Sequence, residues 1–170
     1  MTTVFLGRAA PALFALLACA HAGADAPPAI TEFASYTALV RPPIPARGAD
    51  GRSVEVIEIE EAVQGDGSAR LFRTLRGRCV LLREAARPNE AARTCLYTDP
   101  AGDQFTVEHE PGASERLSAY GVRRGRFVAG TGKFRNLTGE SAAYPVTIGA
   151  TPDPAGSHAT GRVEFRYPAR

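Results

Sequence analysis

His109 and Tyr97 are the two side chains whose types and positions in this sequence could support chemistry. The imidazole of His109 titrates near neutral pH, so it can bind a ligand or move a proton. The phenol of Tyr97 can orient a ligand. Both side chains also have a common alternative role, as packed and hydrogen-bonded interior residues, and the sequence leaves that alternative open.

The segment 99–103 predicts a tight turn that fixes the register of the strands on either side of it. Its sequence DPAGD suits a type I turn, because Asp and Pro favour the first two positions and Gly takes the left-handed position that follows. A three-residue hairpin loop of this kind places Tyr97 opposite Phe105. Since side chains alternate along a strand, Tyr97, Phe105 and His109 share one face, which we interpret as an interior, ligand-binding surface.

Residues 1–24 predict a cleaved signal peptide, and residues 25–29 a short tether. Arg8 is followed by an apolar run over residues 9–20 that is too short to span a membrane. The alternative is a lipoprotein, because the sequence LLAC at residues 16–19 resembles a lipobox with Cys19 as the lipidated residue. We therefore expect a periplasmic or secreted protein, or one that a lipid at Cys19 anchors to the envelope, with no transmembrane span.

The mature chain keeps Cys79 and Cys95, an even pair in an oxidising compartment. A hairpin centred near Arg87 would place the two cysteines opposite each other, so the sequence predicts a cross-strand disulfide over two free thiols. Two cysteines with the remote His109 and His158 lack the spacing of a zinc site. We expect neither a metal nor a cofactor.

The remainder of the chain, residues 30–170, reads as one all-β domain of short strands separated by turns. No mature segment of ten or more residues has a helical period. The strand-like segments are 30–40, 53–63, 75–83, 93–98, 105–110, 116–122, 142–148 and 161–167. The formal net charge of +2 does not favour a nucleic-acid partner.

Three features receive specific interpretations within this pattern. The proline-rich segment 41–45 predicts a rigid extended loop. A phase slip between Val56 and Ile57 predicts a β-bulge, and the following pair Glu60 and Glu61 is interpreted as solvated. The basic segment 123–126 is interpreted as a solvated strand end, with an anion site as the alternative.

The segment 130–139 predicts a sharp corner of a curved sheet, in which Gly130, Gly132 and Gly139 surround an interior aromatic residue, Phe134. With its lead-in from Phe127, this segment resembles the GGTGxF…G signature of allene oxide cyclase-like barrels, which include plant dirigent proteins. Ala129 replaces the usual first Gly. The segment from Cys79 through the 99–103 turn is similar to a bacterial secreted branch of unknown function.

The resemblance implies an eight-stranded antiparallel β-barrel with an apolar cavity, and it makes homodimers or homotrimers plausible. It transfers no catalytic residue, so three functions stay open. The first is non-catalytic binding of a small apolar molecule. The second is an enzyme that steers cyclisation or coupling of a bound apolar intermediate, with His109 and Tyr97 as polar guides. The third is an envelope structural or interaction protein whose barrel is filled by its own side chains.

Overall fold

The computed structural model describes residues 28–84, 86–109, 122–153 and 156–169 of the chain. The predicted signal peptide with Cys19, most of the tether and nearly all of the expected 116–122 strand lie outside these residues. The elements are β1 (Ala29–Val40), β2 (Ile44–Arg47), β3 (Ser53–Gly65), β4 (Thr74–Glu84), β5 (Arg87–Thr98), β6 (Gln104–His109), β7 (Arg123–Gly130), the 3-10 turn η1 (Gly132–Phe134), β8 (Glu140–Asp153) and β9 (Gly156–Pro168). Ala29, expected in the tether, is therefore the first residue of β1.

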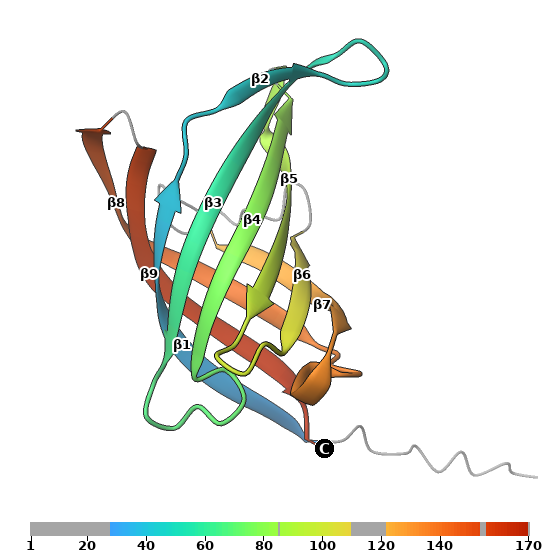
Figure 1. The fold of residues 1–170 in the computed structure, drawn as a ribbon, viewed down its shortest axis with the longest axis vertical. Helices are drawn as coiled ribbons and strands as arrows, with labels where there is room; N and C mark the ends of the chain where they lie inside the picture. Colours follow the sequence, from blue (N-terminus) through green and yellow to red (C-terminus); the bar gives the residue numbers. More distant parts are fainter. Residues whose placement is uncertain (1–27, 85, 110–121, 154–155, 170) are drawn as a thin grey trace, which may run out of the picture.

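The strands close into a barrel (Figure 1). The sheet has nine strands in the order β1-β9-β8-β7-β6-β5-β4-β3-β2, and β1 also pairs with β3. That last pairing joins the two sides of the sheet, while β2 adds to the edge of β3, so eight strands form the closed wall. The neighbouring strands all pair antiparallel. The eight-stranded antiparallel barrel that the resemblance implies is confirmed.

The predicted pairings of both hairpins are confirmed as well, although Arg87 is not the centre of its hairpin: it begins β5 and pairs with Glu84, after a register shift between Leu82 and Glu84. Tyr97 pairs with Phe105 across β5 and β6, and the amide of Asp99 donates to the carbonyl of Asp103 at 3.0 Å. Cys79 pairs with Cys95 across β4 and β5, and the two form the expected disulfide. In the part of the chain that the structure describes, no helix is long and apolar enough to cross a membrane.

Strand β3 differs from the sequence prediction. Its pairing with β4 runs without a register shift from Val54 to Gln64, so the expected bulge between Val56 and Ile57 is absent from this pairing. The alternation that begins at Ile57 therefore continues regularly, and it turns Glu61 into the barrel while Glu60 stays exposed. The interpretation of Glu61 as a solvated residue was wrong.

The proline-rich segment also differs in part from its prediction as a loop. Residues Ile44–Arg47 form β2, a short strand that pairs with the first residues of β3. Proline is compatible with this position because β2 lies at the edge of the sheet, where a missing backbone donor breaks few ladder bonds.

The glycine-rich corner lies where β7 ends at Gly130 and η1 begins. Gly132 has a φ of +48°, a backbone conformation that residues with a Cβ rarely adopt. Phe134 follows and is fully buried, as predicted. The ammonium group of Lys133 lies 2.7 Å from the Asp99 carboxylate, which ties the corner to the neighbouring 99–103 turn.

Aromatic rings fill the end of the barrel that is lowest in Figure 1, which we call the aromatic end. Phe72 comes from the loop between β3 and β4 and has no exposed surface. Its ring centroid lies 4.1 Å from that of Phe165 and 5.3 Å from that of Phe105. The other members of this cluster are Phe127, Phe134 and Tyr167.

A buried carboxylate, Glu32, holds the Phe72 loop in place. It accepts hydrogen bonds from the Tyr167 hydroxyl at 2.6 Å and from the backbone amides of Leu71 and Phe72 at 3.0 Å. Burial works against the charge of Glu32, but these hydrogen bonds outweigh it and lower the pKa of the carboxyl. The aromatic end is thus a packed core closed by a loop that one carboxylate fixes.

Candidate functional site: the polar half of the barrel interior

The barrel interior beyond the aromatic end contains a cluster of buried polar side chains. We call this region the polar half and define its polar cluster as Glu61 of β3, Arg93 and Tyr97 of β5, and His109 of β6. The four residues project inward because each alternates with outward-facing neighbours on its strand. They lie next to the disulfide between Cys79 and Cys95.

Glu61 joins two members of the cluster through its two carboxylate oxygens. One oxygen accepts a hydrogen bond from the Tyr97 hydroxyl at 2.6 Å, and the other pairs with the Arg93 guanidinium. The side chains of Arg93 and Glu61 are each 6% exposed, so this ion pair is buried. Arg93 also directs Nε toward Cys95 Sγ and a terminal nitrogen toward Cys79 Sγ, each at 3.1 Å. The guanidinium therefore lies across the disulfide.

The charges of this network support one another. Burial alone would disfavour the Arg93 cation, but Glu61 and the neighbouring hydroxyls outweigh it and raise the pKa of Arg93. Burial, followed by the negative charge of Glu61, raises the pKa of Tyr97 well above its usual value. At neutral pH Tyr97 is therefore a protonated donor committed to Glu61.

His109 occupies a different electrostatic position. It is 9% exposed, and burial together with the positive charge of Arg93 lowers its pKa to about 4. The ring is therefore neutral at pH 7. Its Nε2 lies 3.9 Å from Cys95 Sγ, and its buried Nδ1 makes no well-formed hydrogen bond, although the Arg124 backbone nearby favours the protonated ring.

Gly125 leaves room for the ring of His109 because it has no side chain. Gly125 of β7 is paired directly with His109, and a Cβ at Gly125 would lie 2.9 Å from Nδ1. The unsatisfied nitrogen therefore lies over the inner face of β7. Two residues earlier on this strand is Arg123, which shares the inward parity of Gly125.

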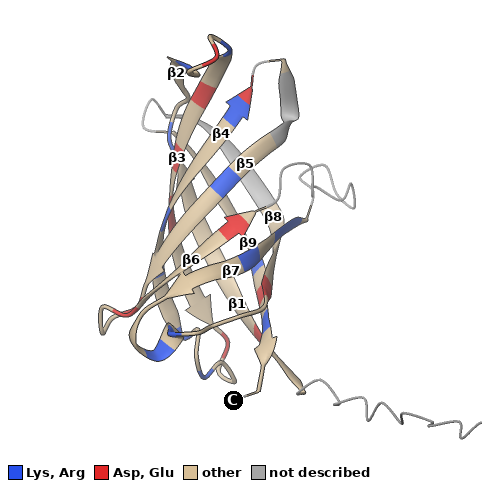
Figure 2. Ribbon diagram, turned by 90° about the vertical axis from the view of Figure 1, so that its right-hand side faces the viewer, with Lys and Arg blue, Asp and Glu red and all other residues tan. Residues whose placement is uncertain are grey.

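Arg123 is the second cation of the polar half. It interacts electrostatically with Arg93, Tyr36 and Glu61, all of which face the interior. Burial, followed by repulsion from Arg93, lowers the pKa of Arg123. The interpretation of the 123–126 segment as a solvated strand end therefore holds only in part for Arg123, which begins β7 but is half-buried and faces the interior. It holds for Arg124 and Arg126, which are exposed. Figure 2 shows blue, basic positions along β7.

The wall around the polar half is built from small or partly exposed side chains. Ala143 of β8 and Ala159 of β9 face inward but remain partly exposed, as do Tyr36, Val40 and Leu81. Solvent therefore reaches inward-facing residues here, whereas Phe72 and Phe134 at the aromatic end have no exposed surface.

The three residues that the sequence grouped as ligand-binding lie on one inward face but have different surroundings. His109 belongs to the polar cluster, and Phe105 is 1% exposed within the aromatic end. Tyr97 joins the two regions, because its ring stacks on Phe105 at 5.1 Å while its hydroxyl donates to Glu61. Sequence reasoning missed Glu61 and Arg93 as cluster members. The alternation of Ile57 and Ile59 into Glu61 was the available signal, since it places all three on one face.

Glu61 and the two cysteines also have the proximity of a metal site. One ligand atom from each lies within 4.8 Å of the others. The sulfur atoms are joined in a disulfide, however, and the carboxylate is occupied by Arg93 and Tyr97. Thiolates are the sulfur ligands that metals need, so this set does not suit a metal.

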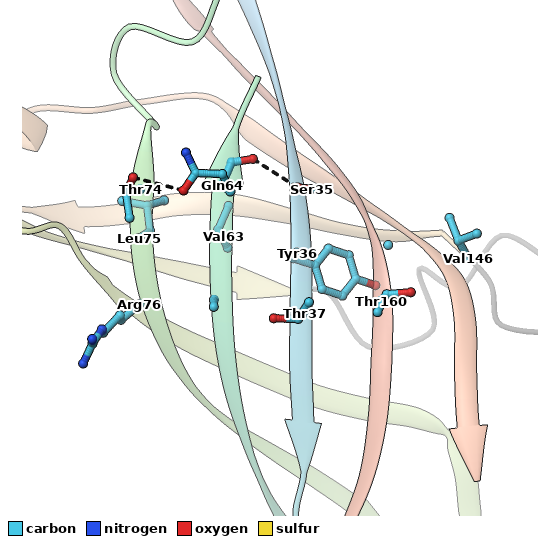
Figure 3. Close-up of a pocket in the computed structure, with 12 residues that line it drawn as sticks. Ser35, Tyr36, Thr37, Val63, Gln64, Thr74, Leu75, Arg76, Val146 and Thr160 are labelled. Carbon is cyan, nitrogen blue, oxygen red and sulfur yellow. Dashed lines mark hydrogen bonds between the residues drawn. The ribbon is translucent and has the colours of Figure 1, made fainter. Parts of the chain in front are cut away.

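A separate pocket of about 510 Å³ lies mainly on the outside of the wall (Figure 3). Its outward-facing lining includes Ser35 and Thr37 of β1, Gln64 of β3 and Thr160 of β9. Ser35 donates to the Gln64 carbonyl at 3.3 Å, so part of this polar lining is already satisfied. Neither Tyr97 nor His109 lines this pocket.

No family model matches the chain, and no curated protein matches it in sequence. Among solved structures, the chain is similar to the pterocarpan synthase dirigent protein PsPTS1, at 14% identity over 84% of this chain and 96% of that chain, with a TM-score of 0.49. It is also similar to the pterocarpan synthase dirigent protein GePTS1, at 14% identity over 85% of this chain and 93% of that chain, with a TM-score of 0.48. At these values the two likenesses carry no argument about residues or function here.

Proposed function

We propose that the barrel binds a small, largely apolar molecule in its polar half and does not transform it. The observation that carries this proposal is the contrast in filling: inward-facing Tyr36, Ala143 and Ala159 are partly exposed, whereas the aromatic end is packed. Small barrels of eight strands can hold one small ligand in this way. The hydrogen bonds of Glu61 with Arg93 and Tyr97 satisfy all three side chains, so this part of the polar cluster is stable without a ligand.

Binding of the neutral fluorescent probe N-phenyl-1-naphthylamine tests this proposal. We expect its fluorescence to rise on mixing with the protein, and the affinity to fall at least tenfold in Ala143→Phe, which fills the interior. The matched control is Thr160→Phe, which adds the same ring to the outside of the neighbouring strand, in the Figure 3 pocket. We expect no change in affinity for that variant.

The two variants also separate the outcomes that contradict the proposal. Loss of binding in Thr160→Phe alone would place the ligand on the outside of the wall. Absence of any fluorescence change with the unchanged protein would overturn binding of apolar molecules. Circular dichroism and urea unfolding of both variants check that each is folded.

An enzyme that steers cyclisation or coupling is the second candidate, and the neutral His109 favours it, because an unprotonated imidazole can accept a proton. Tyr97 fits this role less well, since its raised pKa keeps it protonated. Turnover of a candidate substrate that disappears in His109→Ala and Tyr97→Phe would support catalysis. Unchanged turnover in both variants would remove these residues from a mechanism.

We also propose that the protein works in the periplasm or outside the cell. The disulfide supports this location, because such bonds persist in oxidising compartments. Release by cleavage after the 1–24 signal and anchoring through a lipid on Cys19 are the two routes, and homodimers or homotrimers are the proposed assemblies. Native mass spectrometry of protein from its own envelope would read the mature mass, the assembly and any bound molecule together.

A further inference from the structure

The inward-facing charges of the polar half do not balance. Arg93 pairs with Glu61, and Arg83 pairs with Glu55 at 2.5 Å near the rim. Arg123 makes no ion pair or hydrogen bond with any residue that the structure describes. Among the described side chains of this region, three cations therefore face two carboxylates, and one positive charge remains uncompensated.

Two unsatisfied groups lie close together on one part of the wall. His109 is paired with Gly125, and its unsatisfied Nδ1 lies against the inner face of that residue. Arg123 is two residues from Gly125 on the same strand and faces the same way. Diagonal neighbours of this kind in an antiparallel pair are about 7 to 8 Å apart at Cα, within reach of an Arg side chain.

We infer that the ligand of the polar half is a small apolar molecule carrying one carboxylate, which Arg123 and His109 Nδ1 bind together. This inference rests on the proposed function and adds the chemical class of the ligand. A guanidinium presents paired donors that match the two oxygens of a carboxylate. A neutral imidazole can place its one N–H on Nδ1 and donate to the same group.

The charge count decides between ligand classes. A neutral alcohol or ester would cover the half-buried Arg123 and leave it without a countercharge among the described residues, which is costly. A carboxylate adds one negative charge and balances the described side chains of this region. Arg93 does not compete for this carboxylate, because Glu61 already occupies it.

Displacement of N-phenyl-1-naphthylamine by matched competitors tests the inference on the unchanged protein. The competitors are octanoate and 2-naphthoate, each with its methyl ester, below any micelle concentration. We expect each acid to displace the probe at a concentration at least tenfold lower than its ester. Equal displacement by acid and ester overturns carboxylate recognition and leaves apolar binding intact, whereas failure of the probe itself to bind overturns the proposed function.

Substitutions of charged residues then test which side chain recognises the carboxylate. We expect Arg123→Gln to remove the preference for acid over ester and to leave ester displacement unchanged. The matched control is Arg126→Gln, which removes an exposed outward charge from the same strand and should keep the preference. Loss of the preference in Arg126→Gln but not in Arg123→Gln would overturn the assignment to the interior. If Arg123→Gln fails to fold, Arg123→Lys keeps the charge without the paired donors and should show a weakened preference.

Discussion

The aromatic end and the polar half are built on the same eight strands, yet their interiors are filled by different kinds of side chain and to a different extent. At the aromatic end, Phe72 inserts from a loop and packs without exposed surface against rings that are all buried. In the polar half, Glu61 and Arg93 satisfy each other, and the surrounding side chains are small or partly exposed. The packing of the aromatic end stabilises the fold, and the looser filling of the polar half supports our proposal that a ligand binds there.

The largest expected effect comes from emptying the aromatic end. Phe72→Ala should lower the free energy of unfolding by about 3–5 kcal/mol, because a fully buried ring leaves a cavity. Leu81→Ala in the polar half is the comparison, and it should cost clearly less because Leu81 is already partly exposed. Urea unfolding measures both, and equal losses would contradict the contrast between the two regions.

Breaking the buried ion pair is the next largest effect. Arg93→Met should cost about 3–5 kcal/mol, because Glu61 would be left buried without its cation. The double variant Glu61→Gln with Arg93→Met should recover most of this loss, since no buried charge remains. A loss below about 1 kcal/mol in the single variant would show that water reaches the cluster and solvates it.

Removal of the disulfide between Cys79 and Cys95 tests how much this bond contributes to the stability of the barrel. The two cysteines are 16 residues apart in sequence, and closure of a loop of this length contributes about 3 kcal/mol in the chain-entropy model. Replacing both cysteines with Ser should therefore lower the urea midpoint markedly. Thiol labelling of the denatured, unreduced protein should find neither Cys79 nor Cys95 free, and two labelled thiols would contradict the bond.

The two regions should also respond to acid in different pH windows. The pKa of His109 lies at about 4 in the fold against 6.5 in the unfolded chain, so the unfolded state binds the proton first and stability falls as the pH drops from 6.5 toward 4. The loss has an upper limit of about 3 kcal/mol. The carboxyl of Glu32 has a lowered pKa, so its contribution is present above pH 4.5 and is lost as the pH falls further, through the folded value.

Single substitutions test which residue causes the loss of stability in each pH range. His109→Gln should flatten the stability profile between pH 6.5 and 4, and Glu32→Gln should flatten it only below pH 4.5. Urea unfolding at a series of pH values provides the measurement. An unchanged profile for His109→Gln would show that this ring is solvated rather than buried.

Features set by neighbouring residues were predicted well. The 99–103 turn has local chemistry that fixes its hairpin, so the pairing of Tyr97 with Phe105 and the disulfide followed from counting residues. Glu61 was interpreted as solvated although the alternation of Ile57 and Ile59 already placed it on the inward face, with or without a bulge before Ile57. What stabilises its burial is Arg93 and Tyr97, which come from a strand remote in sequence.

The sequence by itself determined most of the strands, the 99–103 turn, the glycine-rich corner and the cysteine pair, because these depend on residues close along the chain and on the two-residue period of a strand. It did not predict β2 or β7. The tertiary structure decided the closure of β1 onto β3, the burial of Glu32 by the Phe72 loop and the inward position of Arg123. Each of these joins residues that are remote in sequence, and only the closed barrel determines which charges meet inside it.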